Sequence, residues 1–222
     1  MHLILASASP RRAELLRAAG YQFQIVPAHV DESSEPGEGP ARHVRRLAAA
    51  KSAAAQRSAV SGSDLDSLHP DPAANPDARN QDLTPIILGA DTVVVVDGRM
   101  LGKPIDDVDA ARMLRLLSAK HHQVLTGVSV RLGAHELGRV ETTTVHFSSL
   151  TDDEIAWYVA SGEGRDKAGA YAIQGLASRF IPRIDGSYSN VVGLPIACVR
   201  DLLREISSTQ PDRSSPSRST AG

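Results

Sequence analysis

The segment Leu3-Ile4-Leu5-Ala6-Ser7-Ala8-Ser9-Pro10-Arg11-Arg12 decides the fold, because it predicts a strand that turns directly into a helix. Its first three residues form an apolar run typical of a buried strand. Pro10 fits the first turn of a helix, where its missing N–H needs no partner. Backbone N–H groups at such a turn attract anions, and the same turn supplies candidate phosphate ligands: Ser7, Ser9, Arg11 and Arg12. Alternatively, a serine only caps the helix and both arginines lie in solvent.

The composition favours a globular protein that binds a small ligand. With 222 residues, 41% of them hydrophobic, the chain can bury a core of ordinary size in one large or two-lobed domain. The formal net charge of −2 and the aromatic content of 4% disfavour nucleic acid and anionic membranes as partners. Any affinity for phosphate must therefore come from a local cluster of cations.

Cysteine content and hydropathy predict the compartment. The single cysteine, Cys198, excludes a disulfide within the chain and fits a reducing environment. No apolar stretch approaches the roughly 20 residues that span a bilayer, and no export signal is recognised. We expect a cytoplasmic protein.

Strand and helix patterns alternate along the chain, as in an α/β fold. Strand patterns cover residues 3–5, 21–25, 86–96, 124–132 and 140–147, and residues 180–184 and 188–192 predict a further hairpin. Helix patterns cover residues 10–20, 41–58, 106–118, 151–161 and 195–206. Asp97-Gly98 predicts a tight hairpin turn, and Thr151-Asp-Asp-Glu154 matches a capping box.

Two segments interrupt this pattern. Residues 58–85 hold five aspartates and four prolines with few large aliphatic residues, which predicts a flexible inserted loop. Residues 207–222 contain six serines and no large apolar residue, which predicts a disordered tail. Because the motifs on both sides of the loop point to one site, we expect a single catalytic domain over residues 1–206.

Several familiar chemistries do not fit the sequence. The segment from Gly98 to Pro104 has one residue too few between its glycines for a P-loop, and proline replaces the metal-binding Ser/Thr. Gly162-Glu-Gly164 follows a predicted helix and lacks the third glycine of a dinucleotide fingerprint. The sequence also has no Gly-x-Ser-x-Gly elbow and no zinc-type His or Cys spacing.

The remaining polar residues are separated charges. Asp91, next to Thr92, interrupts an apolar strand, so its carboxylate must be hydrogen-bonded, paired or metal-bound. Glu32 is one of four acids in the loop 31–40, which either is solvated or holds a cation. With Lys51, Lys103 and the two arginines, these acids could form a magnesium-assisted phosphoryl site. Spacing alone does not prove that they converge, so an α/β protein of another function stays open.

Four blocks occur in order between Leu3 and Ile206: Ser7-Ala-Ser-Pro-Arg-Arg12, Gly89-Ala-Asp-Thr92, Gly102-Lys-Pro104 and Asp166-Lys-Ala-Gly-Ala-Tyr-Ala-Ile-Gln-Gly175. Together they resemble the Maf family of nucleoside triphosphate pyrophosphatases. The resemblance implies an α/β fold of the Maf and inosine triphosphate pyrophosphatase-like type: a long, mixed, twisted sheet flanked by helices, with two lobes and a central cleft. It also implies cleavage of nucleoside triphosphates to monophosphate and pyrophosphate with a divalent cation, Mg²⁺ or Mn²⁺.

The resemblance assigns roles to residues of this sequence. Asp91 matches the proton acceptor, and three positions match those associated with base selection: Arg11, Thr92 and Gln174. The form Tyr171-x-Ile-Gln-Gly175 looks like the dTTP/UTP branch of the family. Arg12, Lys51 and Lys103 match phosphate-facing cations, and Glu32 matches an acid near the metal, which Asp91 is expected to share. A homodimer is expected from the resemblance alone, and the 58–85 insertion departs from the family pattern.

Three other functions stay open. A pyrophosphatase of the same fold could prefer purine or modified nucleotides. A regulator of septum formation could bind a nucleotide without hydrolysing it, whereas the branch assignment implies house-cleaning of nucleotide pools with a link to division arrest. Binding of nucleic acid is the reading that the composition disfavours most.

Overall fold

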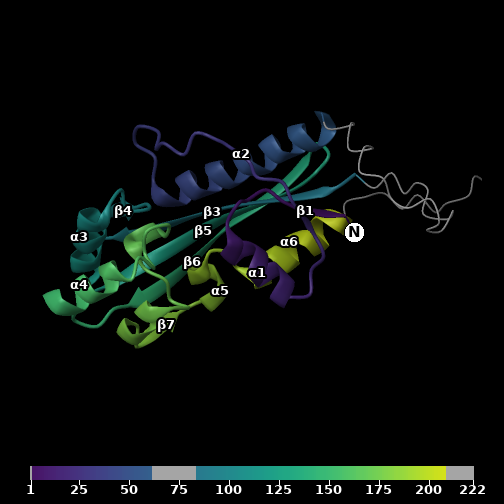
Figure 1. Ribbon diagram of the computed structural model, residues 1–222. Helices are drawn as coiled ribbons and strands as arrows, with labels where there is room; N and C mark the ends of the chain where they lie inside the picture. Colours follow the sequence, from purple (N-terminus) through teal and green to yellow (C-terminus); the bar gives the residue numbers. More distant parts are fainter. Residues whose placement is uncertain (1, 62–83, 209–222) are drawn as a thin grey trace, which may run out of the picture.

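A computed structural model describes residues 2–61 and 84–208, and a seven-stranded mixed sheet lies at its centre (Figure 1). The strands lie in the order β2-β1-β3-β5-β6-β7, and β4 pairs with β3. Their bounds are β1 (Leu3–Leu5), β2 (Gln24–Ile25), β3 (Ile86–Val96), β4 (Arg99–Leu101), β5 (His121–Leu132), β6 (His135–His146) and β7 (Arg183–Asp185). Strand β1 is parallel to β2 and β3, whereas the other pairs among the described strands are antiparallel. The expected mixed sheet is confirmed.

Strand β3 is partnered along only part of one edge. It pairs with β1 as far as Leu88 and with β4 from Val94 onward. Between these two positions, residues 89–93 have no strand partner on that edge among the described residues. Side chains of alternating residues point to opposite faces of a sheet, so this short open edge gives access to both faces at once.

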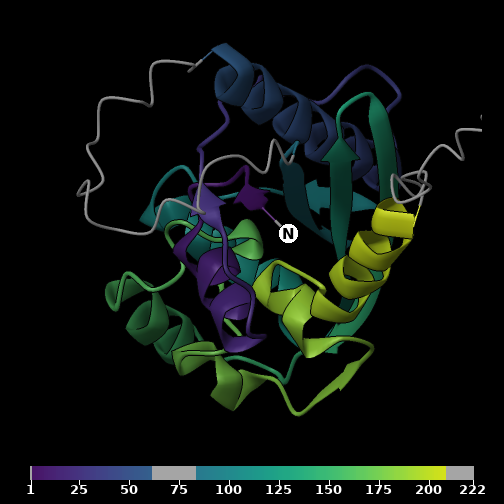
Figure 2. The ribbon, with the colours of Figure 1, turned by 90° about the vertical axis from the view of Figure 1, so that its right-hand side faces the viewer.

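Helix α2 (Pro40–Ser61) covers one face of the sheet (Figures 1 and 2). It lies directly on the backbone of β3 and β5, because a Cβ at Gly89 would collide with the carbonyl oxygen of Ala48 and a Cβ at Gly127 with that of Val44. Glycine at these two positions permits the close approach. The helix therefore lies near enough to β3 for a lysine on it to reach an acid on the strand.

Two groups of helices cover the opposite face, each over its own apolar cluster. Helices α1 (Pro10–Ala18) and α6 (Ile196–Ser208) pack on one half of β3 together with Leu88 and Ala90. Helices α3 (Asp107–Leu117) and α4 (Asp152–Ala160) pack on the other half together with Val94 and Val96. Thr92 falls between the two clusters, whereas Asp91 points to the face that α2 covers. Strands β3 and β5 run through both clusters.

The capping box and the hairpin turn are confirmed. The Thr151 hydroxyl accepts from Glu154 N, and the Glu154 carboxylate accepts from Thr151 N at 2.9 Å. Asp97 and Gly98 both adopt positive φ, 48° and 73°, as a two-residue turn of type I′ requires. Both features depend on neighbouring residues alone.

The predicted hairpin of residues 180–192 is wrong in its second half. Residues Arg183–Asp185 form β7, but Tyr188–Val192 form the short helix α5. Ser187 caps this helix by accepting from the N–H of Asn190, and Gly193 ends it with φ at 125°. The buried Asn190 amide donates to Val124 O and Thr143 Oγ1, both at 3.0 Å. Those distant partners, rather than the local pattern, favour the helix.

Several element ends also differ from expectation. Strand β2 covers residues 24–25 instead of 21–25, β5 begins at residue 121 and β6 covers residues 135–146. Helices α2 and α6 continue through residues 58–61 and 207–208, which are therefore helical rather than loop and tail. The rest of the predicted insertion through residue 83, and the predicted tail from residue 209, lie outside the described residues. Among the described helices, none has the length and apolarity needed to cross a membrane.

Candidate active site

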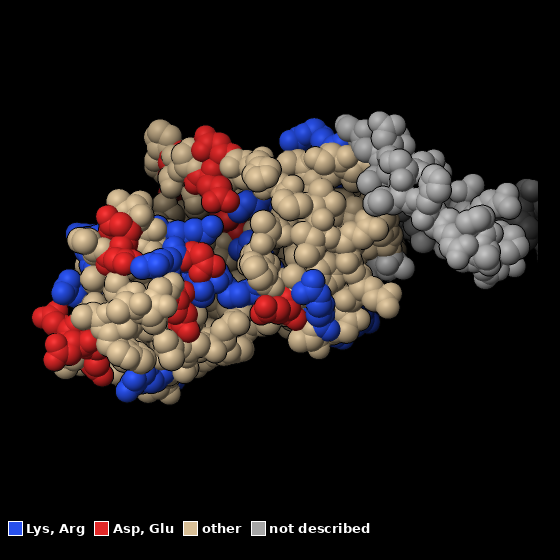
Figure 3. Space-filling model, in the orientation of Figure 1, with Lys and Arg blue, Asp and Glu red and all other residues tan. Residues whose placement is uncertain are grey.

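A pocket of about 500 Å³ lies at the open edge of β3, between the two groups of helices. Its walls come from the turn after β1, the loop before α2, the middle of β3, the loop after β4 and the segment after α4. Figure 3 shows Lys and Arg side chains gathered at the hollow on this face of the molecule. The structure brings every predicted site residue to this one pocket: Ser7, Ser9, Arg11, Arg12, Glu32, Lys51, Asp91, Thr92, Lys103 and Gln174.

Two acids and a lysine form one side of the pocket. Lys51, on α2, is buried and donates to Asp91 Oδ1 at 2.7 Å. The same ammonium group lies 2.6 Å from Glu32 Oε1. Burial alone would raise the pKa of Glu32, but the hydrogen bond from Lys51 and the charges of Lys51, Lys103 and Arg12 lower it. Glu32 is therefore ionised at neutral pH.

The loop that carries Glu32 is fastened to α2 through Glu38. The Glu38 side chain is fully buried and accepts two bonds from Arg46, from Nε at 2.6 Å and from Nη2 at 2.7 Å. It also contacts His43 Nδ1 at 3.0 Å and accepts from Glu35 N at 3.1 Å. These bonds, Arg46 foremost, hold the pKa of Glu38 well below its ordinary value. Sequence reasoning treated the loop as a set of acids and missed this anchor, which no local motif marks.

Arg12 lies against β3 and is largely engaged within the protein. Its Nε donates to Gly193 O at 2.8 Å, while its Nη1 and Nη2 donate to Ser7 Oγ and Thr92 Oγ1, both at 3.1 Å. Burial lowers the pKa of Arg12, and the charge of Asp91 opposes that effect. Arg12 therefore connects the turn after β1, the middle of β3 and the turn after α5.

These contacts decide between the two interpretations of the first turn. Ser9 occupies the N-cap position of α1 but makes no side-chain capping bond, and its N–H instead donates to Ser7 Oγ at 3.2 Å. Neither arginine lies free in solvent, since Arg12 is enclosed and Arg11 has a side chain only 22% exposed. The turn therefore directs its polar groups into the pocket rather than into bulk water.

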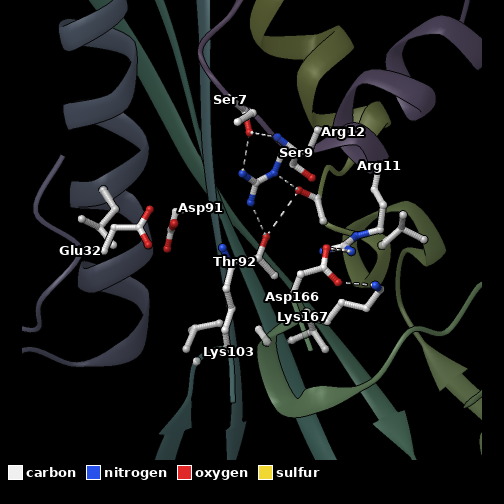
Figure 4. A pocket seen from close by; sticks show the side chains of 18 of the residues that line it. Ser7, Ser9, Arg11, Arg12, Glu32, Asp91, Thr92, Lys103, Asp166 and Lys167 are labelled. Carbon is white, nitrogen blue, oxygen red and sulfur yellow. Dashed lines mark hydrogen bonds and ion pairs between the residues drawn. The ribbon is translucent and has the colours of Figure 1, made fainter. Parts of the chain in front are cut away.

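Arg11 pairs across the pocket with a residue that sequence reasoning left without a role. Its Nη1 donates to Asp166 Oδ2 at 3.1 Å, and Lys167 Nζ donates to Asp166 Oδ1 at 2.5 Å (Figure 4). Both Asp166 and Lys167 line the pocket. They belong to the Asp166–Gly175 block of the sequence, so the motif contained them although no function was assigned to them.

Hydrogen bonds to Tyr158 and Glu163 hold the segment that carries Gln174. Tyr158 OH donates to Glu163 Oε2 at 2.7 Å and accepts from Ala172 N at 3.0 Å. Glu163 Oε1 in turn accepts from Leu176 N at 2.9 Å. Tyr158 belongs to α4, so the helix fixes the segment on both sides of Gln174, which is exposed at the pocket. The sequence predicts α4 through its capping box but gives no sign of these partners.

The carboxylates of the pocket suit a magnesium-type ion that also binds substrate and water. They do not suit a metal held by protein side chains alone. Over residues 2–61 and 84–208, no group of three or more His, Cys, Asp or Glu side chains could hold a metal. Glu32 and Asp91 nevertheless face the same ammonium group, so they are near enough to share a cation. Mg²⁺ in phosphoryl-transfer sites is commonly held by one or two carboxylates, with substrate phosphates and water completing its shell.

The fold and the pocket define an α/β protein with a site for a polyanion beside paired carboxylates. Residues 2–206 match the family described as Maf-like protein, and the chain belongs to that family. Curated relatives named dTTP/UTP pyrophosphatase include one from Geobacter sp. (strain M21), 46% identical over 92% of this chain and 95% of the relative. Another, from Shewanella oneidensis, is 44% identical over 92% of this chain and 98% of the relative. A solved structure of the Staphylococcus aureus Ham1 protein covers 94% of this chain and 98% of its own, with 13% identity and a TM-score of 0.46.

Proposed function

We propose that this chain is a nucleoside triphosphate pyrophosphatase that hydrolyses dTTP and UTP to the monophosphate and pyrophosphate. The observation that carries the proposal is that basic side chains from three separate segments, which carry Arg12, Lys51 and Lys103, meet the acids Glu32 and Asp91 in one pocket. The names of the relatives support the choice of substrates. A triphosphate carries several negative charges, which Arg12, Lys51 and Lys103 would offset.

Glu32 and Asp91 are the residues that would hold the divalent cation. Such an ion, Mg²⁺ or Mn²⁺, supplies neutralisation of phosphate charge and lowers the pKa of water bound to it. Lys51 contacts both carboxylates and keeps them together. It would also face the phosphate chain, because it projects from α2 into the same pocket.

Asp91 is proposed as the proton acceptor for the water that attacks the α-phosphorus. Its Oδ1 accepts from Lys51, whereas its Oδ2 has no hydrogen-bond partner among the described residues. Oδ2 would therefore accept the proton of the water. General-base assistance of this kind contributes roughly 10² to 10⁴ in rate.

Base selection would come from the opposite side of the pocket. The Gln174 amide offers one acceptor and two donors, which match the alternating carbonyl and N–H groups of uracil and thymine. The Thr92 hydroxyl already contacts Arg12 and Thr126. Thr92 would thus act mainly by holding Arg12. Arg11 retains N–H groups for which the described residues provide no acceptor.

The test is a substrate panel on the purified full chain. Monophosphate and pyrophosphate are measured from UTP, dTTP, CTP, ATP and GTP, with Mg²⁺, Mn²⁺ or a chelator. We expect metal-dependent turnover of UTP and dTTP within about a factor of 10 to 200 of each other, since one methyl group discriminates no more strongly. The purine triphosphates should react slowly.

Two results would contradict the proposal. Preference for GTP or another purine would replace the pyrimidine branch with the purine alternative. Nucleotide binding without release of pyrophosphate would instead support the non-hydrolytic regulator. Action in the cytoplasm, expected from the single cysteine, and assembly as a homodimer, expected from the family resemblance, belong to the same proposal.

A further inference from the structure

Asp166 lies at the pocket on the side opposite Glu32 and Asp91 (Figure 4). Both of its carboxylate oxygens are engaged, Oδ2 by Arg11 and Oδ1 by Lys167. At the triphosphate end, the cation and Lys51 would offset the charges of Glu32 and Asp91, whereas a further carboxylate there would repel the substrate. The place of Asp166 away from the paired acids therefore puts it at the nucleobase end of a ligand whose α-phosphorus lies near Asp91.

Arg11 depends on this carboxylate for its orientation. Its guanidinium donates to Asp166, its single acceptor among the described residues, while the neighbouring Arg12 has three separate acceptors. A guanidinium has five N–H donors in a planar fork, so an arginine held at one point can present its other donors to a ligand. Without that contact, the side chain would be free to turn toward the triphosphate.

Asp166 is itself held in place. Lys167, which neutralises it, also donates to Glu163 O at 2.7 Å. On the other side, Arg165 makes two bonds of 2.9 Å to Asp107 and so ties the same segment to α3. Burial would raise the pKa of Asp166, but the hydrogen bond from Lys167 and the charge of Arg11 lower it. The carboxylate is therefore an ionised, fixed acceptor.

We propose that Asp166 is a positioning residue that holds the Arg11 guanidinium toward the nucleobase and thereby contributes to the selection of uracil and thymine. Both of these bases present two carbonyl acceptors, which suit the remaining N–H donors of Arg11. Cytosine and adenine instead present an amino group, which needs an acceptor. The inference rests on the proposed function, because it concerns how that same site selects its substrate.

The test compares Asp166→Asn with the unmodified chain. For each protein, kcat and KM are measured separately with UTP and with CTP, which carries an amino group where UTP has a carbonyl. We expect the ratio of kcat/KM for UTP to that for CTP to fall about tenfold, the lower end of what one pocket contact supplies. Removing a negative charge would by itself favour every triphosphate alike and leave the ratio unchanged. Asp166→Glu, which keeps the carboxylate, should retain most of the ratio.

Asp107→Asn is the matched control. It removes the ion pair that anchors Arg165, the residue next to Asp166, yet Asp107 does not line the pocket. It should loosen the same segment without changing the UTP to CTP ratio. An equal fall in this control would show that loosening alone is responsible and would overturn the proposal.

Arg11→Lys gives a second measurement that does not depend on the folding of Asp166→Asn. Arg11→Lys should lower the ratio alone, and adding Asp166→Asn should lower it no further, because the two residues act as one unit. Independent effects, or an unchanged ratio in Asp166→Asn, would overturn the inference. If the unmodified chain hydrolyses no triphosphate, the proposed function fails. If it prefers UTP and dTTP while the variants keep that preference, only the inference fails.

Discussion

The residues of the pocket differ in how many of their polar atoms are already hydrogen-bonded within the protein. Arg12 and Ser7 are engaged by neighbouring groups, so they maintain the shape of the site as much as they could contact a ligand. Arg11 keeps unused donors, and Lys103 is exposed at the pocket. Adjacent arginines in one motif therefore have different physical roles, which the motif alone does not reveal.

Asp91→Asn should lower kcat for UTP by about 10² to 10⁴. The amide keeps an acceptor for Lys51 but takes up no proton, so affinity for a non-hydrolysable UTP analogue should change little. Calorimetric titration with that analogue, beside steady-state kinetics, measures both quantities. Asp152→Asn is the control, because this aspartate is 81% exposed and pairs only with Arg115 among the described residues. Equal loss of binding and turnover would remove Asp91 from the base role.

Among the helices and strands, α2 is the one whose position depends most on glycines, and these lie in the strands beneath it. It rests on the backbone of β3 and β5 at Gly89 and Gly127, and Lys51 projects from it toward Asp91. The predicted helix was correct because alanine-rich spacing is a local property. Its contact with the sheet was not predictable, since a glycine within a strand has several possible uses.

Gly89→Ala should weaken both the fold and the site. The new Cβ would collide with the carbonyl oxygen of Ala48, so α2 must shift away from the sheet and carry Lys51 with it. Overpacking of this kind costs about 1 to 3 kcal/mol, visible as a lower Tm, and kcat should fall as well. Gly39→Ala is the control, because a Cβ there meets no atom of the described residues within 4 Å. An unchanged Tm in Gly89→Ala would show that the helix accommodates the methyl group.

In the whole molecule, one buried histidine makes stability depend on pH. His122 contacts Tyr171 OH through Nε2 at 2.8 Å and packs between the rings of Phe147 and Tyr171. Burial lowers its pKa from 6.5 to about 3. Below pH 6.5, His122 binds a proton in the unfolded chain but stays neutral in the folded chain. Stability therefore falls as the pH drops from 6.5 toward 3.

His122→Gln should therefore show a smaller loss of Tm between pH 7 and pH 4 than the unmodified chain, as measured by thermal unfolding across that range. His121→Gln, one residue away on the exposed side of β5, serves as the control and should keep the original slope. If both variants and the unmodified chain share one slope, His122 is not the group responsible.

How much of the structure the sequence predicts also depends on contacts across the whole molecule. Strand β3, the capping box and the hairpin turn follow from adjacent residues and were predicted. The residues of the pocket could be named individually, but their convergence comes from sheet order and from contacts such as Arg11 with Asp166, 155 positions apart. Helix α5 was predicted as a strand for the same reason, because Asn190 finds its partners on β5 and β6. Contacts at such separations leave no trace in local periodicity.

Continuous strands through both apolar clusters limit how this protein can move. In enzymes whose lobes are joined by a flexible linker, substrate is captured by a hinge between rigid bodies. Here the two halves, one around each apolar cluster, share the paired strands β3 and β5. A hinge between the halves would have to break hydrogen bonds between these strands. Adjustment to an incoming nucleotide must therefore come from side-chain rotation and from the loops that form the walls of the pocket, while the strands beneath it stay rigid.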